Sequence, residues 1–126
     1  MADKLIGTHL LVKTAIADEA ITANRFVKLV TPITGLAHIV TAGAGDAACG
    51  VAPFGYDSGD IADFVKIGEA WVTANENIAA GALVAADTAG KAKNAVSTNH
   101  VLGQAQQDTN SGDAVLVLLH YAGIKA

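Results

Sequence analysis

The chain repeats itself, and this internal repeat constrains the fold more than any other feature of the sequence. Residues 50–60 (GVAPFGYDSGD) align without a gap on residues 103–113 (GQAQQDTNSGD). The two segments share five of eleven residues, where a chain of this composition gives about one by chance. Upstream of them, residues 20–30 (AITANRFVKLV) align on residues 77–87 (NIAAGALVAAD).

These alignments divide the chain into two related halves, at about residues 20–68 and 76–121. Together the halves are predicted to form one β domain over residues 21–126, because a chain of 126 residues is the size of a single domain. Each half contains a strand, a glycine turn, a second strand, a Gly-x-Ala segment, a Ser-Gly-Asp turn and a final apolar strand. The final strands are expected at residues 61–67 and 114–121, and the second, apolar on both faces, is typical of a central buried strand.

Many short strands at this spacing predict an all-β fold, either a small barrel or a clip-like (β-tulip-like) domain built from two pseudo-repeats. The alternative is a helix over the alanine-rich residues 76–93, which helix propensity alone favours. Gly81 and Gly90 interrupt that segment, and its aligned partner, residues 25–30, is rich in strand formers, so strands are preferred there. A short helix or turn over residues 99–108 is left open.

Composition indicates a protein that depends on neighbours for part of its stability. Of its 126 residues, 26 are Ala and 13 are Gly, so the core is expected to consist of small side chains that each bury little apolar area. Charged residues make up 16% of the chain and the net charge is −4. This balance does not favour nucleic acid or an anionic membrane as a partner.

The sequence contains no recognisable arrangement of residues for catalysis or for binding a cofactor or metal. Residues 43–48 (GAGDAA) resemble a dinucleotide-binding turn, but Gly50 follows too soon for the helix that such a site needs, so a loop is favoured. Asp57, Asp60 and Asp63 lack the spacing of a calcium loop. The four histidines are scattered, and the single cysteine supplies no metal cage. We therefore expect no enzyme, no cofactor and no metal.

Two segments are predicted to bind a partner. Residues 1–20 precede the repeat, have no aligned counterpart in the second half, and form either an extended arm that adds to another chain or an ordinary first strand. The loop with Phe54 and Tyr56 aligns with a polar loop, residues 106–108, so one half is expected to face a partner and the other water. Trp71 is expected in the core. The predicted partner-binding residues are Leu5, Ile6, Leu10, Leu11, Val12, Phe54 and Tyr56.

This order of turns and strand starts resembles the small capsid cement, or head decoration, proteins of tailed bacteriophages. The resemblance covers about residues 20–121. The segments that carry it are residues 21–23, 50–52, 58–60, 72–81, 86–91, 102–105 and 111–117. The longer N-terminal segment and the loop at residues 53–56 depart from the family's compact pattern.

The resemblance implies a structural protein that binds the outer surface of a phage capsid and bridges neighbouring major capsid subunits, without catalysis or a cofactor. It also implies a homo-oligomer, with a trimer favoured, whose N-terminal arm becomes ordered against the shell. The protein is then expected in the virion, after assembly in the host cytoplasm. The alternative is a β module of a head or tail fibre that binds a host glycan or protein through Phe54 and Tyr56.

Overall fold

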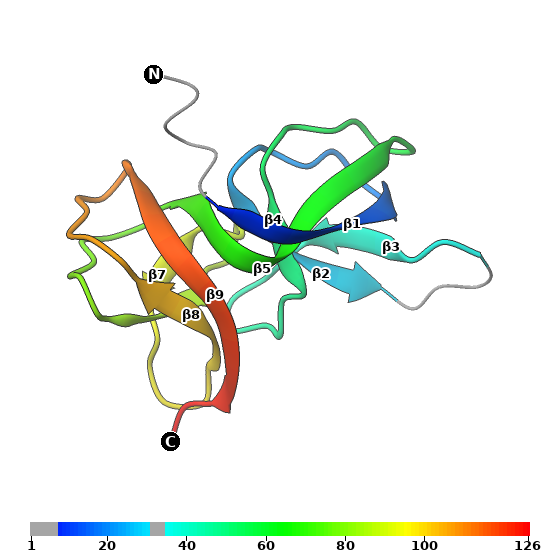
Figure 1. Ribbon diagram of the computed structural model, residues 1–126. Helices are drawn as coiled ribbons and strands as arrows, with labels where there is room; N and C mark the ends of the chain where they lie inside the picture. Colours follow the sequence, from blue (N-terminus) through cyan, green and yellow to red (C-terminus); the bar gives the residue numbers. More distant parts are fainter. Residues whose placement is uncertain (1–7, 31–34) are drawn as a thin grey trace.

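The computed structural model describes residues 8–30 and 35–126, and in these residues the regular elements are all strands (Figure 1). Leu5 and Ile6 lie outside the described residues. The nine strands found there are β1 (His9–Ala17), β2 (Arg25–Val30), β3 (His38–Thr41), β4 (Gly50–Ala52), β5 (Ile61–Thr73), β6 (Leu83–Ala86), β7 (Ala92–Asn94), β8 (His100–Ala105) and β9 (Ala114–Ile124). The predicted all-β fold is therefore confirmed.

The strands form two rings that share β5. In the first ring, β1 pairs with β5 on one side and with β3 on the other, so β1, β3, β2, β4 and β5 close on themselves. In the second ring, the order β5, β9, β8, β6 and β7 is closed by one parallel bridge between Ala74 and Ala92. Figure 1 shows β5 passing between β1 to β4 on one side and β7 to β9 on the other.

Strand pairing repeats residue by residue between the rings, which confirms the two pseudo-repeats. Ile16 of β1 pairs with Ile61 of β5, and their equivalents, Thr73 of β5 and Ala114 of β9, pair in the same way. The second half of β5 is therefore the counterpart of β1, and the expectation that the N-terminal segment has no counterpart is wrong. Sequence alignment misses this match because β5 ends one repeat and begins the next.

Each ring encloses its own core, and eight core positions are equivalent. The first core contains Ala15, Ala17, Ile21, Val27, Ile39, Ala52, Ala62 and Phe64. Their equivalents in the second core, in the same order, are Val72, Ala74, Ile78, Val84, Ala92, Ala105, Val115 and Val117. Ala15 and Ala62 correspond to the larger Val72 and Val115, and Ile39 and Phe64 correspond to the smaller Ala92 and Val117, so the differences in side-chain volume offset each other.

Residues 76–93, which have high helix propensity, and residues 99–108, for which a short helix or turn is considered above, both contain strands. Strand β6 lies within residues 76–93 and β7 begins there, as preferred from the repeat. Strand β8 lies within residues 99–108, so the suggested short helix there is wrong. Pairing of β8 with β6 and β9 decides this, because it satisfies the backbone of these residues in a ladder.

Two expectations of complete burial are also wrong. β9 is central in the sheet but is buried on one face only, since Val117 is 0% and Leu118 is 40% exposed. Trp71, which pairs with Leu116 of β9, is half-buried and belongs to neither core. The reason is the same in both cases: this face of β5 and β9 is the outside of the second ring.

Gly50 and Gly103 occupy equivalent positions at which two strands approach closely. A Cβ atom on Gly50 would lie 2.2 Å from the carbonyl oxygen of Val65, and one on Gly103 would lie 2.3 Å from that of Leu118. The close approach of the two strands therefore explains why each half has a glycine at the start of its Gly-x-Ala segment.

We predict that Gly50→Ala and Gly103→Ala each lower the free energy of unfolding by about 2 kcal/mol, because backbone in a paired strand must move to admit the methyl group. Urea denaturation measures the change. Gly55→Ala is the control: its Cβ would meet the nearest atom at 3.5 Å, and the expected change is below about 0.5 kcal/mol. If Gly50→Ala lowers the free energy of unfolding and Gly103→Ala leaves it unchanged, the equivalence of the two rings is contradicted.

Candidate interaction surfaces

The first half of β1 presents an apolar edge. Leu10 is 72% exposed, Leu11 39% and Val12 45%. β5 pairs with one edge of β1 along its length, whereas β3 pairs with the other edge only at Ile16 and Ala17. Among the described residues, the outer edge of β1 before Ile16 thus lacks a partner strand. Such an edge is able to accept a strand or an apolar surface of another chain.

Ile67 extends this apolar surface onto β5. It pairs with Leu11 and is 49% exposed. β5 has one extra residue, Lys66, between the partners of Leu11 and Val12, so the alternation of inward and outward side chains is interrupted there. Sequence reasoning missed Ile67 because this irregularity arises from pairing with β1 and leaves no local signal in the sequence.

The aromatic loop contains one exposed and one anchored side chain. Phe54 is 60% exposed. Tyr56 packs against the first core, its main chain bridges to Ile21, and its hydroxyl oxygen accepts a hydrogen bond from the Asp63 N–H at 3.1 Å. Tyr56 therefore stabilises the turn before β5, and Phe54 is the member of the pair that is available to a partner.

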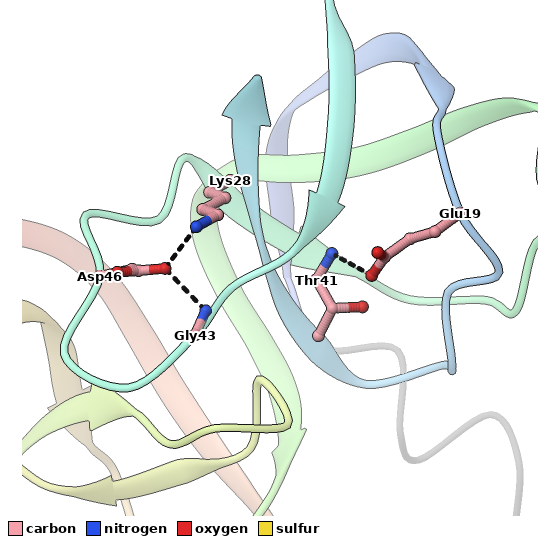
Figure 2. Close-up of polar contacts among 5 residues, drawn as sticks. All are labelled: Glu19, Lys28, Thr41, Gly43 and Asp46. Carbon is pink, nitrogen blue, oxygen red and sulfur yellow. Dashed lines mark hydrogen bonds and ion pairs between the residues drawn. The ribbon is translucent and has the colours of Figure 1, made fainter. Parts of the chain in front are cut away.

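Asp46 organises the loop at residues 43–48 (Figure 2). Its carboxylate accepts hydrogen bonds from Lys28 Nζ at 2.7 Å and from the Gly43 N–H at 2.8 Å. The hydrogen bond from Lys28, and after it that from Gly43, lowers the pKa of Asp46 from its ordinary value. Asn99 builds the same turn in the second half by accepting from the Val96 N–H at 3.0 Å. This loop is a repeated structural turn.

Two equivalent glutamates help to close the rings. The Glu19 carboxylate accepts a hydrogen bond from the Thr41 N–H at 3.2 Å, as Figure 2 shows, and the Glu76 carboxylate accepts one from the Asn94 N–H at 3.0 Å. Each glutamate follows the end of the first strand of its ring, β1 or β5. There it accepts a hydrogen bond from the backbone of the strand that closes the ring, β3 or β7. Their position explains why both halves have a glutamate there.

Cys49, His38 and His100 are each held by burial or by a hydrogen bond. Burial raises the pKa of Cys49 to about 11, so its thiol is protonated at neutral pH and is a weak nucleophile. His38 Nδ1 is hydrogen-bonded to the Asp18 carboxylate, and His100 Nδ1 lies 2.7 Å from the Tyr121 hydroxyl. In the part of the chain that the structure describes, no three His, Cys, Asp or Glu residues gather as a metal site. Residues 8–30 and 35–126 also contain no helix able to span a membrane.

A cleft of about 340 Å³ lies between the two rings, lined by strands of both. Its walls are mainly apolar, and they also contain Cys49, Lys66, His120 and Tyr121. Ile67 is also part of the lining, so the cleft continues the exposed surface of β1 and β5.

Comparison with known proteins gives a likeness in structure alone. No family model matches the sequence, and no curated protein matches it. Among solved structures, the crystal structure of the head fiber gp8.5 N base of bacteriophage phi29 is similar, with a TM-score of 0.75 over 92% of this chain and 98% of that chain. At 19% identity, this likeness establishes a shared fold over nearly the whole chain.

We predict that Asp46→Asn lowers the free energy of unfolding at pH 7 by about 0.5–1 kcal/mol, the range for an ion pair that is one-third exposed. A carboxyl group with a lowered pKa in the folded state contributes stability above its ordinary pKa of 3.8, and this contribution is lost as the pH falls through the lowered value. The difference between variant and parent, measured by urea denaturation, is therefore expected to shrink in that acidic range.

Asn99→Asp is the matched control for this prediction, because Ala85 stands where the first half has Lys28. The added carboxylate keeps the turn but gains no lysine partner, so no stabilisation at pH 7 is expected. An Asp46→Asn penalty that is equally large at acidic pH would contradict the role given to the ion pair.

Proposed function

We propose that this protein is a non-enzymatic structural component of a bacteriophage virion, which binds the outer surface of the head and bridges neighbouring major capsid subunits. The observation that most supports this is the fold shared with a protein described as the N base of a head fiber, over 92% of this chain and 98% of that one. The resemblance of the turns and strand starts to head decoration proteins agrees with it. The protein acts as a homo-oligomer, with a trimer favoured, and uses no cofactor, nucleic acid or membrane.

The exposed apolar surface supplies the contact with the shell. Leu10, Leu11 and Val12 of β1 and Ile67 of β5 are all more than one-third exposed, beside an open strand edge. Burial of such side chains against a partner contributes favourable free energy that the solvated protein lacks. In this proposal, the half of β1 whose outer edge lacks a partner strand among the described residues binds the capsid.

Stabilisation of the shell follows from the number of copies. Each copy buries a surface on the order of 1,000 Å² across a seam between capsid subunits. A gain of about 2–3 kcal/mol at each of many seams slows rupture of a shell under internal pressure by orders of magnitude. A core made largely of alanine and valine fits this role, because binding to the shell adds to the limited stability of the free protein.

The second candidate is a module of a head fibre that binds a host glycan or protein. The description of the structural neighbour as a fiber base favours it. Phe54, 60% exposed on the loop before β5, is the aromatic side chain that such a module would present to a glycan.

Copy number in purified virions of the phage that encodes this chain separates the two candidates. We expect a stoichiometry close to that of the major capsid protein, because a bridging protein occupies every equivalent seam. Quantitative mass spectrometry measures it. A few tens of copies or fewer per virion would favour the fibre module, and absence from purified virions would overturn both.

We predict that Leu10→Ser combined with Leu11→Ser weakens binding to purified heads more than tenfold, because two apolar side chains leave the contact. The thermal midpoint of the free protein is expected to change little, since both residues are already exposed. Ile124→Ser, at a residue 63% exposed in the other ring, is the control and is expected to bind normally. Unchanged binding by the double variant in a co-sedimentation assay would refute the role of β1.

A further inference from the structure

The contact between the two rings depends on one row of side chains of the first ring. Phe26 of β2 pairs with Val51 of β4, and Val51 pairs with Val65 of β5, so the three side chains lie side by side on one face. They are 1%, 0% and 0% exposed. Together with Ala42 they belong to the core of the second ring. The second ring thus covers this outer face of the first.

The second ring has the equivalent row on its own outer face. Leu83 of β6 pairs with Gln104 of β8, Gln104 pairs with Leu118 of β9, and Leu118 pairs with Glu69 of β5. We call these four residues the outer row. Leu83 is 43% and Leu118 is 40% exposed, and Gln104 is exposed as well. Leucines therefore remain open to solvent at positions whose equivalents in the first ring are buried.

The surface of the second ring that packs on Phe26, Val51 and Val65 also has an equivalent on the first ring. On the second ring it includes Ala70, Ala86, Leu102 and Leu119, which belong to the second core or pack against it. The equivalent positions on the first ring are Lys13, Leu29, Cys49 and Lys66, which we call the receiving surface. Leu29 is 53% exposed, both lysines are exposed and Cys49 is half-buried. The first ring thus presents an open version of a surface that the second ring uses within the chain.

We propose that the outer row of one copy docks on the receiving surface of a second copy, so that copies associate head to tail as the two rings do within one chain. Continuity with the existing contact supports this, because the same backbone arrangement already packs once in every molecule. Charge supports it as well: the outer row contains Glu69, and the receiving surface contains Lys13 and Lys66. Leu83 and Leu118 meet Leu29 between these charges, the usual arrangement of an interface with an apolar centre and a polar rim.

The two surfaces of this contact differ, so it is heterologous, and it closes into a ring when the rotation per copy permits. It specifies how the homo-oligomer proposed above forms. It does not require binding to a phage head, and the residues involved are distinct from Leu10 and Leu11. Failure of one proposal is therefore distinguishable from failure of the other.

Sedimentation velocity of the full chain over a concentration series tests the proposal. The parent protein is expected to increase in mean mass with concentration, and Leu83→Ser with Leu118→Ser is expected to raise the dissociation constant at least tenfold. Ile61→Ser is the matched control, because Ile61 is 67% exposed and lies outside both surfaces. Urea denaturation of each variant confirms that the fold is retained.

Charge reversal tests the pairing of the two surfaces. Glu69→Lys alone and Lys66→Glu alone are each expected to weaken association, and the two together in one chain are expected to restore part of it. A parent protein that stays monomeric at every concentration, or association that Ile61→Ser weakens as much as the outer-row variant, overturns the inference. A monomer that still binds heads overturns this inference and the proposed homo-oligomer, and leaves the proposed binding to the phage head standing.

Discussion

The two-ring structure depends on β5, which pairs with β1 over its first half and with β9 over its second half. Gly68 is where the partner changes: it pairs with both His9 and Leu119. A Cβ atom at this position would lie 2.2 Å from the carbonyl oxygen of Thr8, so only glycine admits the start of β1 so close to β5. One strand thus belongs to both rings, and the core of the second ring also includes Phe26, Val51 and Val65 of the first ring.

This sharing determines which surfaces remain for partners. The second ring covers the face of the first ring at Phe26, Val51 and Val65, while the equivalent face of the second ring stays open. The N-terminal half of β1 is open for a different reason, since β3 reaches only its C-terminal end. One chain thus has two separate apolar surfaces, one proposed to bind a phage head and the other a further copy.

Much of the fold was predictable because the repeated turns impose local backbone requirements. Gly59 and Gly112, each in a Ser-Gly-Asp turn, have φ of +92° and +91°, a conformation that favours glycine in any context. The candidate surface was predictable only in part. Leu10, Leu11 and Val12 were identified from a strand-forming apolar run, whereas Ile67 and Leu118 were missed and Trp71 was expected in the core. Exposure of these three residues depends on which ring packs against which face.

The amino-acid order alone establishes the duplication, the all-β class and the small-residue core, because period, turn glycines and side-chain size are properties of short segments. It does not determine which apolar residues are buried, since apolar residues follow the same pattern along a strand whose outer face is buried and along one whose outer face is exposed. Only the assembled rings decide this. Packing of the first ring on the second buries Val65 and leaves its equivalent, Leu118, at the surface, and no local feature of either strand distinguishes the two.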